Sequence, residues 1–409
     1  MTTIAAAPPG PSRPGGPDRR ITVQVLASAD LIDDTDWARV AEHAGLYSSP
    51  RWLRALEADP SYDTWYLVAR DEGDVVRAIV PAYLDSGTAG SGIGTFYDPA
   101  HVFDRPPGMS DEGPALLLGG RTGYGTELLV DPAMAAPDRR TILDAVTTRA
   151  GELAQAWSTG TVAALYLDAG PAAELATVWG SVALLTDVGA DIELTGRRDF
   201  DGYVAALPAG RRSSVRREVR EFAASGLSAA WTRLSTCVED LAPLVASHHR
   251  RYGHPDGADQ LEAHLRSQAQ ELDDLSRVLV VRDDGRLVGA LLAYEWRDVW
   301  YCRLVAVDER LRGRGFATFA LIFYEPIRAA LAAGASRYAL GPSSLTSKVG
   351  RGATPVGRWS VLGGRGVPEP GWAGAWNLRA ANAWANDLRQ TPQETSRLLR
   401  RDPRIGKGP

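Results

Sequence analysis

A loop rich in glycine and arginine, RLRGRGFAT at 310–318, has the clearest chemical character in the sequence. It joins a predicted strand that ends near Val307 to a predicted helix that starts near Gly315. Glycines let a backbone approach an anion without a Cβ in the way, and the free N–H groups of a helix start attract that anion. The loop therefore predicts a diphosphate site, although a plain strand-to-helix turn with two glycines is the alternative. The expected binding residues are Arg310, Arg312, Gly313, Arg314, Gly315, Phe316, Ala317 and Thr318.

Lys348 is the second candidate, in the polar stretch GPSSLTSKVGRG at 341–352. Only two of the 45 basic residues are lysines, the other being Lys407, so a lysine has been kept where arginine is the usual choice. An ammonium is a compact point charge, unlike the planar guanidinium fork. Lys348 is predicted to hold a substrate anion or to stabilise a developing oxyanion. A solvated lysine in a surface loop is the other interpretation.

Arginines also recur along a predicted helix over 213–225 and just before it. Arg212, Arg216 and Arg220 follow each other at four-residue spacing, which places them on one helix face. This face predicts an anion cradle, with a solvated charged face as the alternative.

Acid–base groups are harder to assign from the sequence. Glu295, at the end of a predicted strand, is the candidate general base, and a solvent-facing glutamate is the competing interpretation. His248, His249 and His254 lie close together in the sequence but lack cysteines or spaced carboxylates, so no metal site is expected.

The elements that must position these residues occur in two similar series, each with helices, a hairpin, a further strand, a helix and a strand. Period-two alternation and short apolar runs predict strands at 21–27, 65–70, 75–84, 127–130, 162–169, 278–284, 287–296, 299–307 and 337–341. Helices are predicted near 37–44, 50–58, 139–157, 213–225, 239–251, 258–273, 315–333 and from 376 onward, with a kink at Pro326. This order predicts an α+β (mixed α/β) fold with two tandem domains.

The domain organisation follows from these series and from composition. A Pro- and Gly-rich stretch at 1–20 is expected to be a disordered tail. The predicted domains cover 21–195 and 196–370, and a helix and basic tail occupy 371–409.

Composition limits the classes of protein that the chain could represent. With 409 residues, 44% hydrophobic and 23% charged, it is typical of a multidomain globular protein. No apolar run of about 18 residues occurs, so no membrane span is expected. Two cysteines exclude a disulfide framework and fit a reducing cytoplasm. The net charge of -5 argues against general nucleic-acid binding.

Residues 278–321 resemble the GNAT acyltransferase superfamily. In that family the phosphate loop reads Arg/Gln-x-x-Gly-x-Gly/Ala and follows a strand whose backbone pairs with the pantetheine arm of acyl-CoA. The resemblance implies that Val305, Ala306 and Val307 form this strand edge here. It also implies, for each domain, a mixed and splayed sheet flanked by helices, with the acyl thioester in the splay.

Two such units in one chain are similar to the Fem-type peptidyltransferases and related peptidoglycan-biosynthesis-like N-acyltransferases. The stretches that carry this likeness are 49–53, 211–226 and 341–352. The likeness implies that Arg211, Arg212 and Arg216 bind a phosphate or carboxylate of the acceptor, together with Lys348. Fem-type enzymes that use aminoacyl-tRNA usually lack an intact CoA loop, so the loop at 310–317 favours acyl-CoA as the donor.

The sequence therefore predicts a cytoplasmic, metal-free N-acyltransferase, a monomer or homodimer. Its C-terminal domain would bind acyl-CoA, such as acetyl-CoA, as co-substrate, and its degenerate N-terminal domain would form the acceptor side. The acceptor is expected to be an amino group of a small molecule or peptide-like compound. Two alternatives stay open: a peptidyltransferase that uses aminoacyl-tRNA, and a non-catalytic acyl-CoA sensor.

Overall fold

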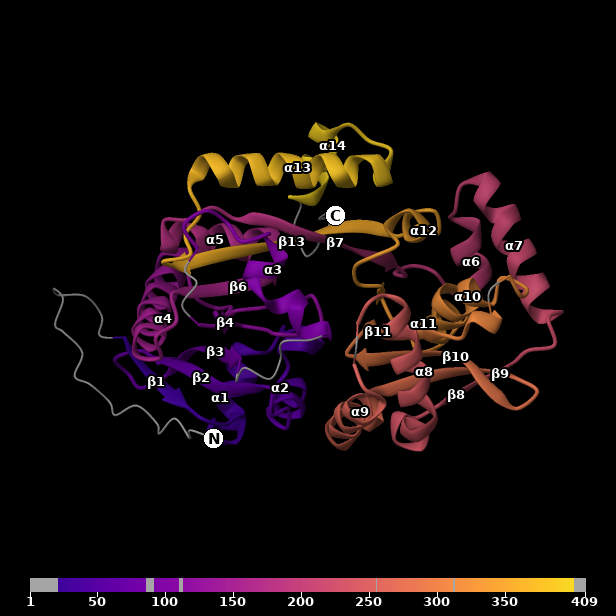
Figure 1. The fold of residues 1–409 in the computed structure, drawn as a ribbon, viewed down its shortest axis with the longest axis horizontal. Coiled ribbons are helices and arrows are strands. Elements are labelled where there is room, and N and C mark those ends of the chain that lie inside the picture. The colour runs from indigo at the N-terminus through magenta and orange to yellow at the C-terminus, as the bar shows by residue number, and fades with distance from the viewer. Residues whose placement is uncertain (1–20, 86–91, 110–112, 255, 312, 401–409) are drawn as a thin grey trace.

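The fold was analysed in a computed structural model that describes residues 21–85, 92–109, 113–254, 256–311 and 313–400. The tail predicted at 1–20, Arg312 and the last part of the basic tail at 401–409 lie outside the described residues. Figure 1 shows the stretch 21–195, here called the N-terminal half, beside the stretch 196–370, the C-terminal half.

One mixed sheet of 13 strands runs through both halves, in the order β1-β2-β3-β4-β6-β13-β7-β12-β11-β10-β9-β8, with β5 pairing with β3. The strands of the N-terminal half are β1 (Thr22–Leu26), β2 (Tyr62–Arg70), β3 (Val76–Asp85), β4 (Leu116–Leu118), β5 (Leu129–Val130), β6 (Thr161–Leu167) and β7 (Leu184–Glu193). Those that follow are β8 (Ser228–Thr232), β9 (Ser276–Asp283), β10 (Arg286–Trp296), β11 (Val299–Val307), β12 (Arg337–Ala339) and β13 (Thr354–Gly364).

The two halves exchange strands where they meet. Strand β13, late in the chain, lies between β6 and β7 of the N-terminal half and is antiparallel to both. Strand β7 in turn pairs with β12 of the C-terminal half. The sheet is therefore continuous across the middle of the molecule.

Strands β11 and β12 separate soon after they meet. They pair in parallel over only three positions, the last being Tyr301 with Ala339. Beyond this point β11 continues to Val307 beside β10 alone. The expected mixed, splayed α+β sheet is confirmed.

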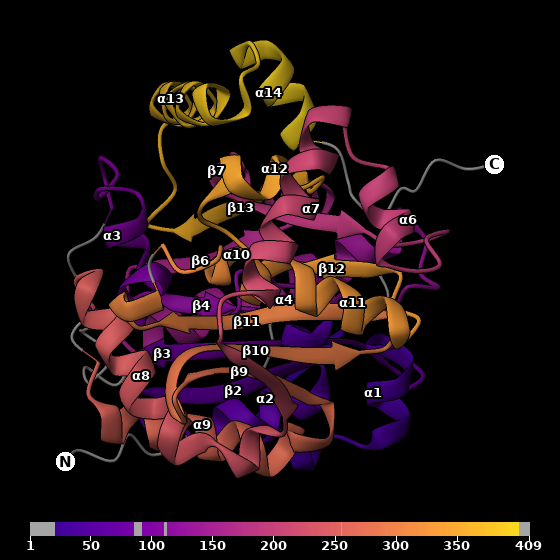
Figure 2. The same cartoon turned by 90° about the vertical axis from the view of Figure 1, so that its right-hand side faces the viewer.

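Helices cover both faces of the sheet (Figures 1 and 2). The helices that come before β11 in the chain are α1 (Asp34–Val40), α2 (Pro50–Glu57), α3 (Pro99–Val102), α4 (Ala136–Ala156), α5 (Ala169–Trp179), α6 (Phe200–Ala205), α7 (Ala209–Ala223), α8 (Val238–Arg251) and α9 (Ala258–Leu272). Those that follow are α10 (Ala317–Phe319), α11 (Glu325–Ala332), α12 (Leu345–Val349), α13 (Pro370–Leu388) and α14 (Pro392–Leu399). No helix in the described ranges is long and apolar enough to cross a membrane.

The helix expected to start near Gly315 and to reach residue 333 is not α-helical throughout. A π-helical turn at Ala320–Tyr324 separates α10 from α11, and Pro326 lies at the start of α11. Proline is tolerated in a first helical turn, where its missing N–H has no helical partner to lose. The break therefore occurs one turn before the proline.

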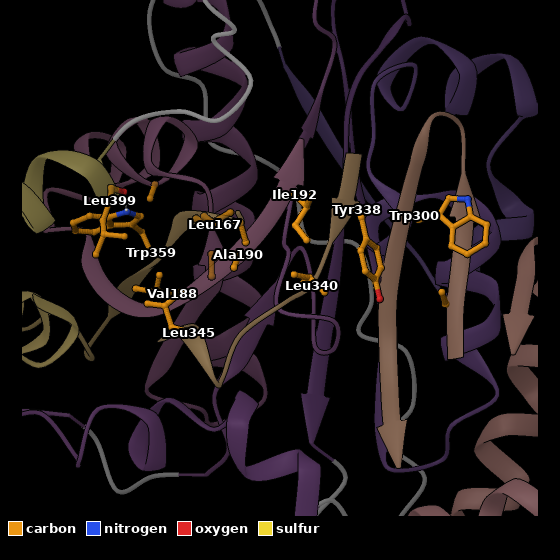
Figure 3. Packing of buried hydrophobic residues seen from close by; sticks show 14 of the residues in the cluster. Leu167, Val188, Ala190, Ile192, Trp300, Tyr338, Leu340, Leu345, Trp359 and Leu399 are labelled. Atoms are coloured by element: carbon orange, nitrogen blue, oxygen red, sulfur yellow. Dashed lines mark hydrogen bonds between the residues drawn. The ribbon is translucent and has the colours of Figure 1, made fainter. Parts of the chain in front are cut away.

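The largest hydrophobic cluster extends across the junction of the two halves. Val188, Ala190 and Ile192 of β7 belong to the same cluster as Tyr338 of β12 and Trp359 of β13 (Figure 3). Because this core is shared, the halves are held together by buried apolar side chains as well as by strand pairing.

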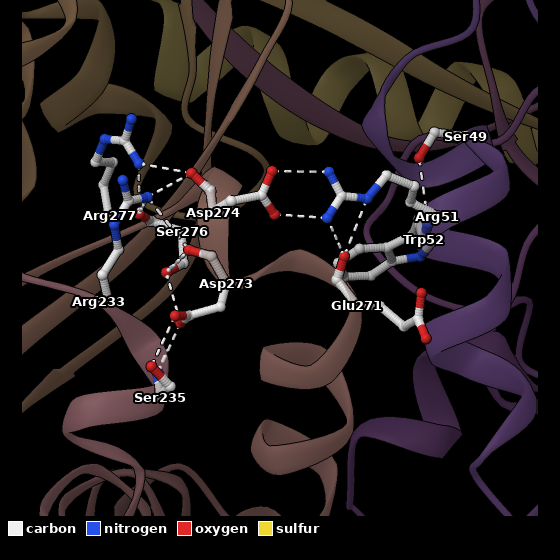
Figure 4. A network of polar contacts seen from close by, with 10 residues as sticks. All are labelled: Ser49, Arg51, Trp52, Arg233, Ser235, Glu271, Asp273, Asp274, Ser276 and Arg277. Carbon is white, nitrogen blue, oxygen red and sulfur yellow. Dashed lines mark hydrogen bonds and ion pairs between the residues drawn. The ribbon is translucent and has the colours of Figure 1, made fainter.

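A polar contact also joins the halves, at the N-terminus of α2. Ser49 caps this helix by accepting a hydrogen bond from the Trp52 N–H at 3.2 Å. Arg51 forms a bidentate ion pair with Asp274, at 3.0 and 2.5 Å, and also binds the Glu271 carbonyl at the end of α9 (Figure 4). The stretch 49–53 thus fixes α2 against the C-terminal half.

Candidate active site

A cavity of about 860 Å³ lies between the two halves and includes the splay of β11 and β12. From the N-terminal half it is lined by residues 45–48, 123–127, 187 and 189–191, and from the C-terminal half by residues of α8, α9, β11, α10 and α12. This cavity combines apolar walls with a few charged groups, as small-molecule sites commonly do.

Lys348 lies in this cavity, on the short helix α12 rather than in a loop, and its side chain is buried. Its Nζ donates hydrogen bonds to the carbonyl oxygens of Leu340, Gly341 and Pro342, at 3.0, 2.8 and 2.6 Å. Burial lowers the pKa of Lys348 to about 8, although nearby Cys302, Asp187 and Asp191 counteract the shift. The alternative interpretation, a solvated lysine in a surface loop, is therefore wrong.

Two aspartates of β7, which the sequence analysis missed, share the cavity with Lys348. Burial raises the pKa of Asp187 to about 6, while the Val188 N–H and the Lys348 charge counteract it. Burial also raises the pKa of Asp191, which pairs with Arg337 at 3.2 Å. The available signal was a pair of carboxylates in an otherwise apolar strand.

The phosphate loop has one open glycine and one packed glycine. Gly313 has φ +73° and nothing within 4 Å of the position of a Cβ, so a ligand could approach its backbone. A Cβ on Gly315 would lie 2.7 Å from the Glu221 carbonyl oxygen at the end of α7. Gly315 is therefore required by helix packing, whatever the loop binds.

Some charged groups and amides around the loop are already bonded within the protein, whereas others could bind a ligand. Arg314 is held in an ion pair with Asp283. The N–H groups of Gly313, Gly315 and Phe316 donate no hydrogen bond within the described ranges. Thr318, at the start of α10, lines the cavity, so the cavity reaches the helix that follows the loop.

The edge of β11 is partly occupied by α8. Val305 and Val307 line the cavity, whereas Ala306 is buried in the core beneath. The Val307 carbonyl accepts a hydrogen bond from Arg251, and its N–H donates to His248 Nδ1 at 3.4 Å. A ligand that paired with Val307 would have to displace these contacts.

Several candidates from the sequence do not reach the cavity. Glu295 forms an ion pair with Arg277 of β9 at 2.6 Å and does not line it. Arg211, Arg212 and Arg216 lie on α7 and do not line it either. His249 binds Asp256 at 2.8 Å, and the described residues contain no cluster suited to a metal ion.

The depressed pKa of Lys348 predicts a specific dependence of stability on pH. Between about pH 8 and its usual pKa of 10.5, the unfolded chain binds a proton at Lys348 that the folded chain has lost. The free energy of unfolding should therefore rise with pH in this window, relative to Lys348→Met, which lacks the titrating group. Urea unfolding of both proteins between pH 7.5 and 10 measures the difference, and a constant difference would contradict the depressed pKa.

Comparisons with known proteins agree with this geometry. Residues 209–349 match the family model described as an acetyltransferase (GNAT) domain. The fold is similar to that of FemX, with a TM-score of 0.53 and 12% identity over 80% of this chain and 94% of that chain. It is also similar to the C-terminal domain of a putative lysylphosphatidylglycerol synthetase from Agrobacterium fabrum, with a TM-score of 0.50 and 12% identity over 86% of this chain and 96% of that one.

A tandem GNAT protein from the clavulanic acid biosynthesis pathway matches with a TM-score of 0.49 and 17% identity, over 85% of this chain and 100% of that chain. No curated protein sequence matches. The segment that resembled the family in sequence, 278–321, falls inside the matched residues 209–349.

Proposed function

We propose that this chain, whose residues 209–349 match the model of a GNAT acetyltransferase domain, transfers an acyl group from acyl-CoA to an amine. The observation that carries the proposal is the buried ammonium of Lys348 in a cavity that extends from the splay of β11 and β12 to the start of α10. An amine and a thioester held together in this cavity would not have to meet by diffusion. This proximity accounts for a large part of the rate acceleration in such transfers.

The charged groups of the cavity suit the steps of this reaction. The amine attacks the thioester carbonyl, and the Lys348 ammonium stabilises the negative charge that develops on its oxygen. Asp187, with a pKa of about 6, takes the proton that the attacking amine loses. The C–S bond then breaks, and the leaving thiolate, whose usual pKa is about 8.5, takes up its proton from solvent, because all three N–H groups of Lys348 already donate to carbonyl oxygens.

The loop at 310–317 supports acyl-CoA as the donor. Gly313 offers open backbone, and its N–H and those of Gly315 and Phe316 donate to no described residue, which suits a phosphate group. The strand edge at 303–307 would then hold the pantetheine arm, with Val305 as its main contact because Val307 is bonded to α8.

An aminoacyl-tRNA donor is the second candidate, and one observation favours it. Arg212, Arg216 and Arg220 form an extended cationic face on α7, and none of them has a carboxylate partner among the described residues. Such a face could contact a nucleic-acid backbone, whose binding would weaken steeply with salt.

A single experiment separates the donors and tests the loop. Wild type, Gly313→Asp and Gly313→Asn are titrated with acetyl-CoA by calorimetry. Both side chains are among those best tolerated at positive φ, but only aspartate adds a charge that repels phosphate. Gly313→Asp should weaken binding at least tenfold, and Gly313→Asn clearly less.

The same proteins are then assayed for transfer to amines from acetyl-CoA, from longer acyl-CoAs and from charged tRNA, with and without ribonuclease. Transfer from acyl-CoA that survives ribonuclease supports the proposal. Transfer only from charged tRNA, or equal affinity in all three proteins, would refute the acyl-CoA assignment. Binding of acetyl-CoA without transfer to any amine would instead indicate a sensor.

A further inference from the structure

Arg303 occupies an unusual place in the sheet. On β11, Cys302 pairs with Ala293 of β10, and Leu304 pairs with the adjacent residue Leu292, so Arg303 is the extra residue of a β-bulge. The bulge lies two positions beyond the last pair between β11 and β12, within the splay. Bulges next to functional sites commonly redirect a side chain, and Arg303 lines the cavity.

The guanidinium of Arg303 has no acidic partner in the part of the chain that the structure describes. Its Nη2 donates one hydrogen bond, to Thr122 Oγ1 at 3.1 Å, and the group lies over the Trp52 ring at 5.5 Å from the centroid. Its Nε is buried and has no hydrogen-bond partner. Among the residues that the structure describes, no carboxylate lies within the 4.0 Å of an ion pair with Arg303.

Other arginines near the cavity are neutralised. Arg121, next to Thr122 in the chain, pairs with Asp59 at 2.9 Å, and Arg358, which lines the cavity, pairs with Asp168. Arg303 thus brings to the cavity lining a positive charge that no described carboxylate neutralises through an ion pair. A partly desolvated guanidinium without a counter-charge is costly, and a planar anion relieves that cost by binding to the fork.

Carboxylates such as Asp187 line the same cavity but form no ion pair with Arg303, and two histidines near it favour their neutral forms. Burial lowers the pKa of His264 to about 4, with a further contribution from Arg303, so His264 is neutral at pH 7. Burial also lowers the pKa of His249, although Asp256 counteracts the shift. The nearby wall of the N-terminal half presents the phenol rings of Tyr47 and Tyr124.

We propose that Arg303 binds an anionic group, a carboxylate or a phosphate, that is carried by the amine acceptor. Arg303 lies four residues before the end of β11, which is about 13 Å along an extended strand, and the phosphate loop lies beyond that end. Its hydrogen-bond partner Thr122 belongs to the opposite half of the molecule. The assignment to the acceptor rests on the proposed function, whereas the anion site itself does not.

The anion site can be tested without any catalysis. Sodium acetate and inorganic phosphate are titrated separately into the full chain at constant ionic strength, with calorimetric detection. The variants are Arg303→Gln, Arg303→Lys and, as a control, Arg277→Gln, whose arginine pairs with Glu295 outside the cavity. At least one anion should bind wild type and the control with similar affinity. It should bind Arg303→Gln at least tenfold more weakly, and Arg303→Lys with intermediate affinity.

Comparison of the two anions identifies which group the site prefers. Equal binding by wild type and Arg303→Gln, or no binding of either anion by wild type, would overturn the proposal. Circular dichroism checks the fold of each variant. If Arg303→Gln does not fold, Arg303→Lys decides, because a lysine lacks the bidentate fork and should bind several-fold more weakly.

The acceptor class is tested with amines that differ only in the anionic group. Phosphoethanolamine is compared with ethanolamine, and β-alanine with its amide, with acetyl-CoA as donor. Wild type should have at least tenfold higher kcat/KM for one anionic amine than for its uncharged counterpart. Arg303→Gln should lose this preference mainly through a higher KM for the anionic amine. Its Kd for acetyl-CoA should be unchanged. Transfer without any preference would refute the acceptor assignment, whereas absence of all transfer would refute the proposed function and leave the anion titration to decide the site.

Discussion

Replacing Lys348 with alanine should lower kcat/KM for acyl transfer at least tenfold, equivalent to about 1.4 kcal/mol of transition-state stabilisation. The ammonium is buried in the cavity and fixed by the carbonyl oxygens of Leu340, Gly341 and Pro342. Lys348→Arg should also lower kcat/KM at least tenfold, because a planar guanidinium cannot make three hydrogen bonds from one nitrogen in a packed site. Steady-state kinetics with both substrates varied measure the effect.

Glu295→Gln is a suitable control for this experiment. Glu295 was a candidate base from the sequence, but its carboxylate pairs with Arg277 and does not line the cavity. The control should keep kcat/KM within about twofold of wild type. Wild-type kinetics in Lys348→Ala, or a loss in Glu295→Gln equal to that in Lys348→Ala, would contradict the assignment of Lys348.

The second large effect concerns stability. Glu218→Gln should lower the free energy of unfolding by about 3 kcal/mol or more, because it leaves the buried guanidinium of Arg351 without a counter-charge. Glu218 and Arg351 are both buried and pair at 2.8 Å. Arg351 also donates to the Tyr324 hydroxyl at 3.0 Å and lies 3.6 Å from the Phe319 ring centroid. Urea unfolding at pH 7 measures the loss.

The double variant Glu218→Leu with Arg351→Met is the matched control. Because it removes both charges, it should be less destabilised than Glu218→Gln, as is common when a buried pair is replaced by apolar residues. If Glu218→Gln lowers the free energy of unfolding by less than about 1 kcal/mol, water solvates the Arg351 charge in place of Glu218. Since Arg351 also donates to the Ser347 carbonyl at 3.2 Å, next to Lys348, disruption of this pair should disturb the site as well.

Local sequence patterns predicted well those strands and helices whose own composition and periodicity indicate their structure. The apolar run at 299–307 corresponds to β11, and the hairpin at 278–296 corresponds to β9 and β10 within two residues at each end. These segments are buried in regular strands, so their composition reflects their environment. The loop at 310–318 likewise lies between β11 and α10 as the sequence predicted, and its binding of a phosphate stays a prediction.

Features that depend on distant segments could not be predicted in this way. Nothing in the alternation of β13 indicates that it inserts between β6 and β7, because periodicity reports which face is buried and not which strand is the neighbour. The same limit applies to Asp187 and Asp191, which reach the cavity only because β7 is placed beside β12. Arg303 was missed because a bulge, not the strand pattern, determines its direction.

The late position of β13 in the sequence has a consequence for the order of folding. When residues 21–195 have left the ribosome, β6 and β7 have no strand between them, because the residues that fill this gap, Thr354–Gly364, are still to be synthesised. The nascent N-terminal half must therefore wait with unpaired strand edges and part of its apolar core exposed. Its sheet is completed only after β13 has been synthesised, so the edges of β6 and β7 that face each other stay without their partner strand while the C-terminal half emerges.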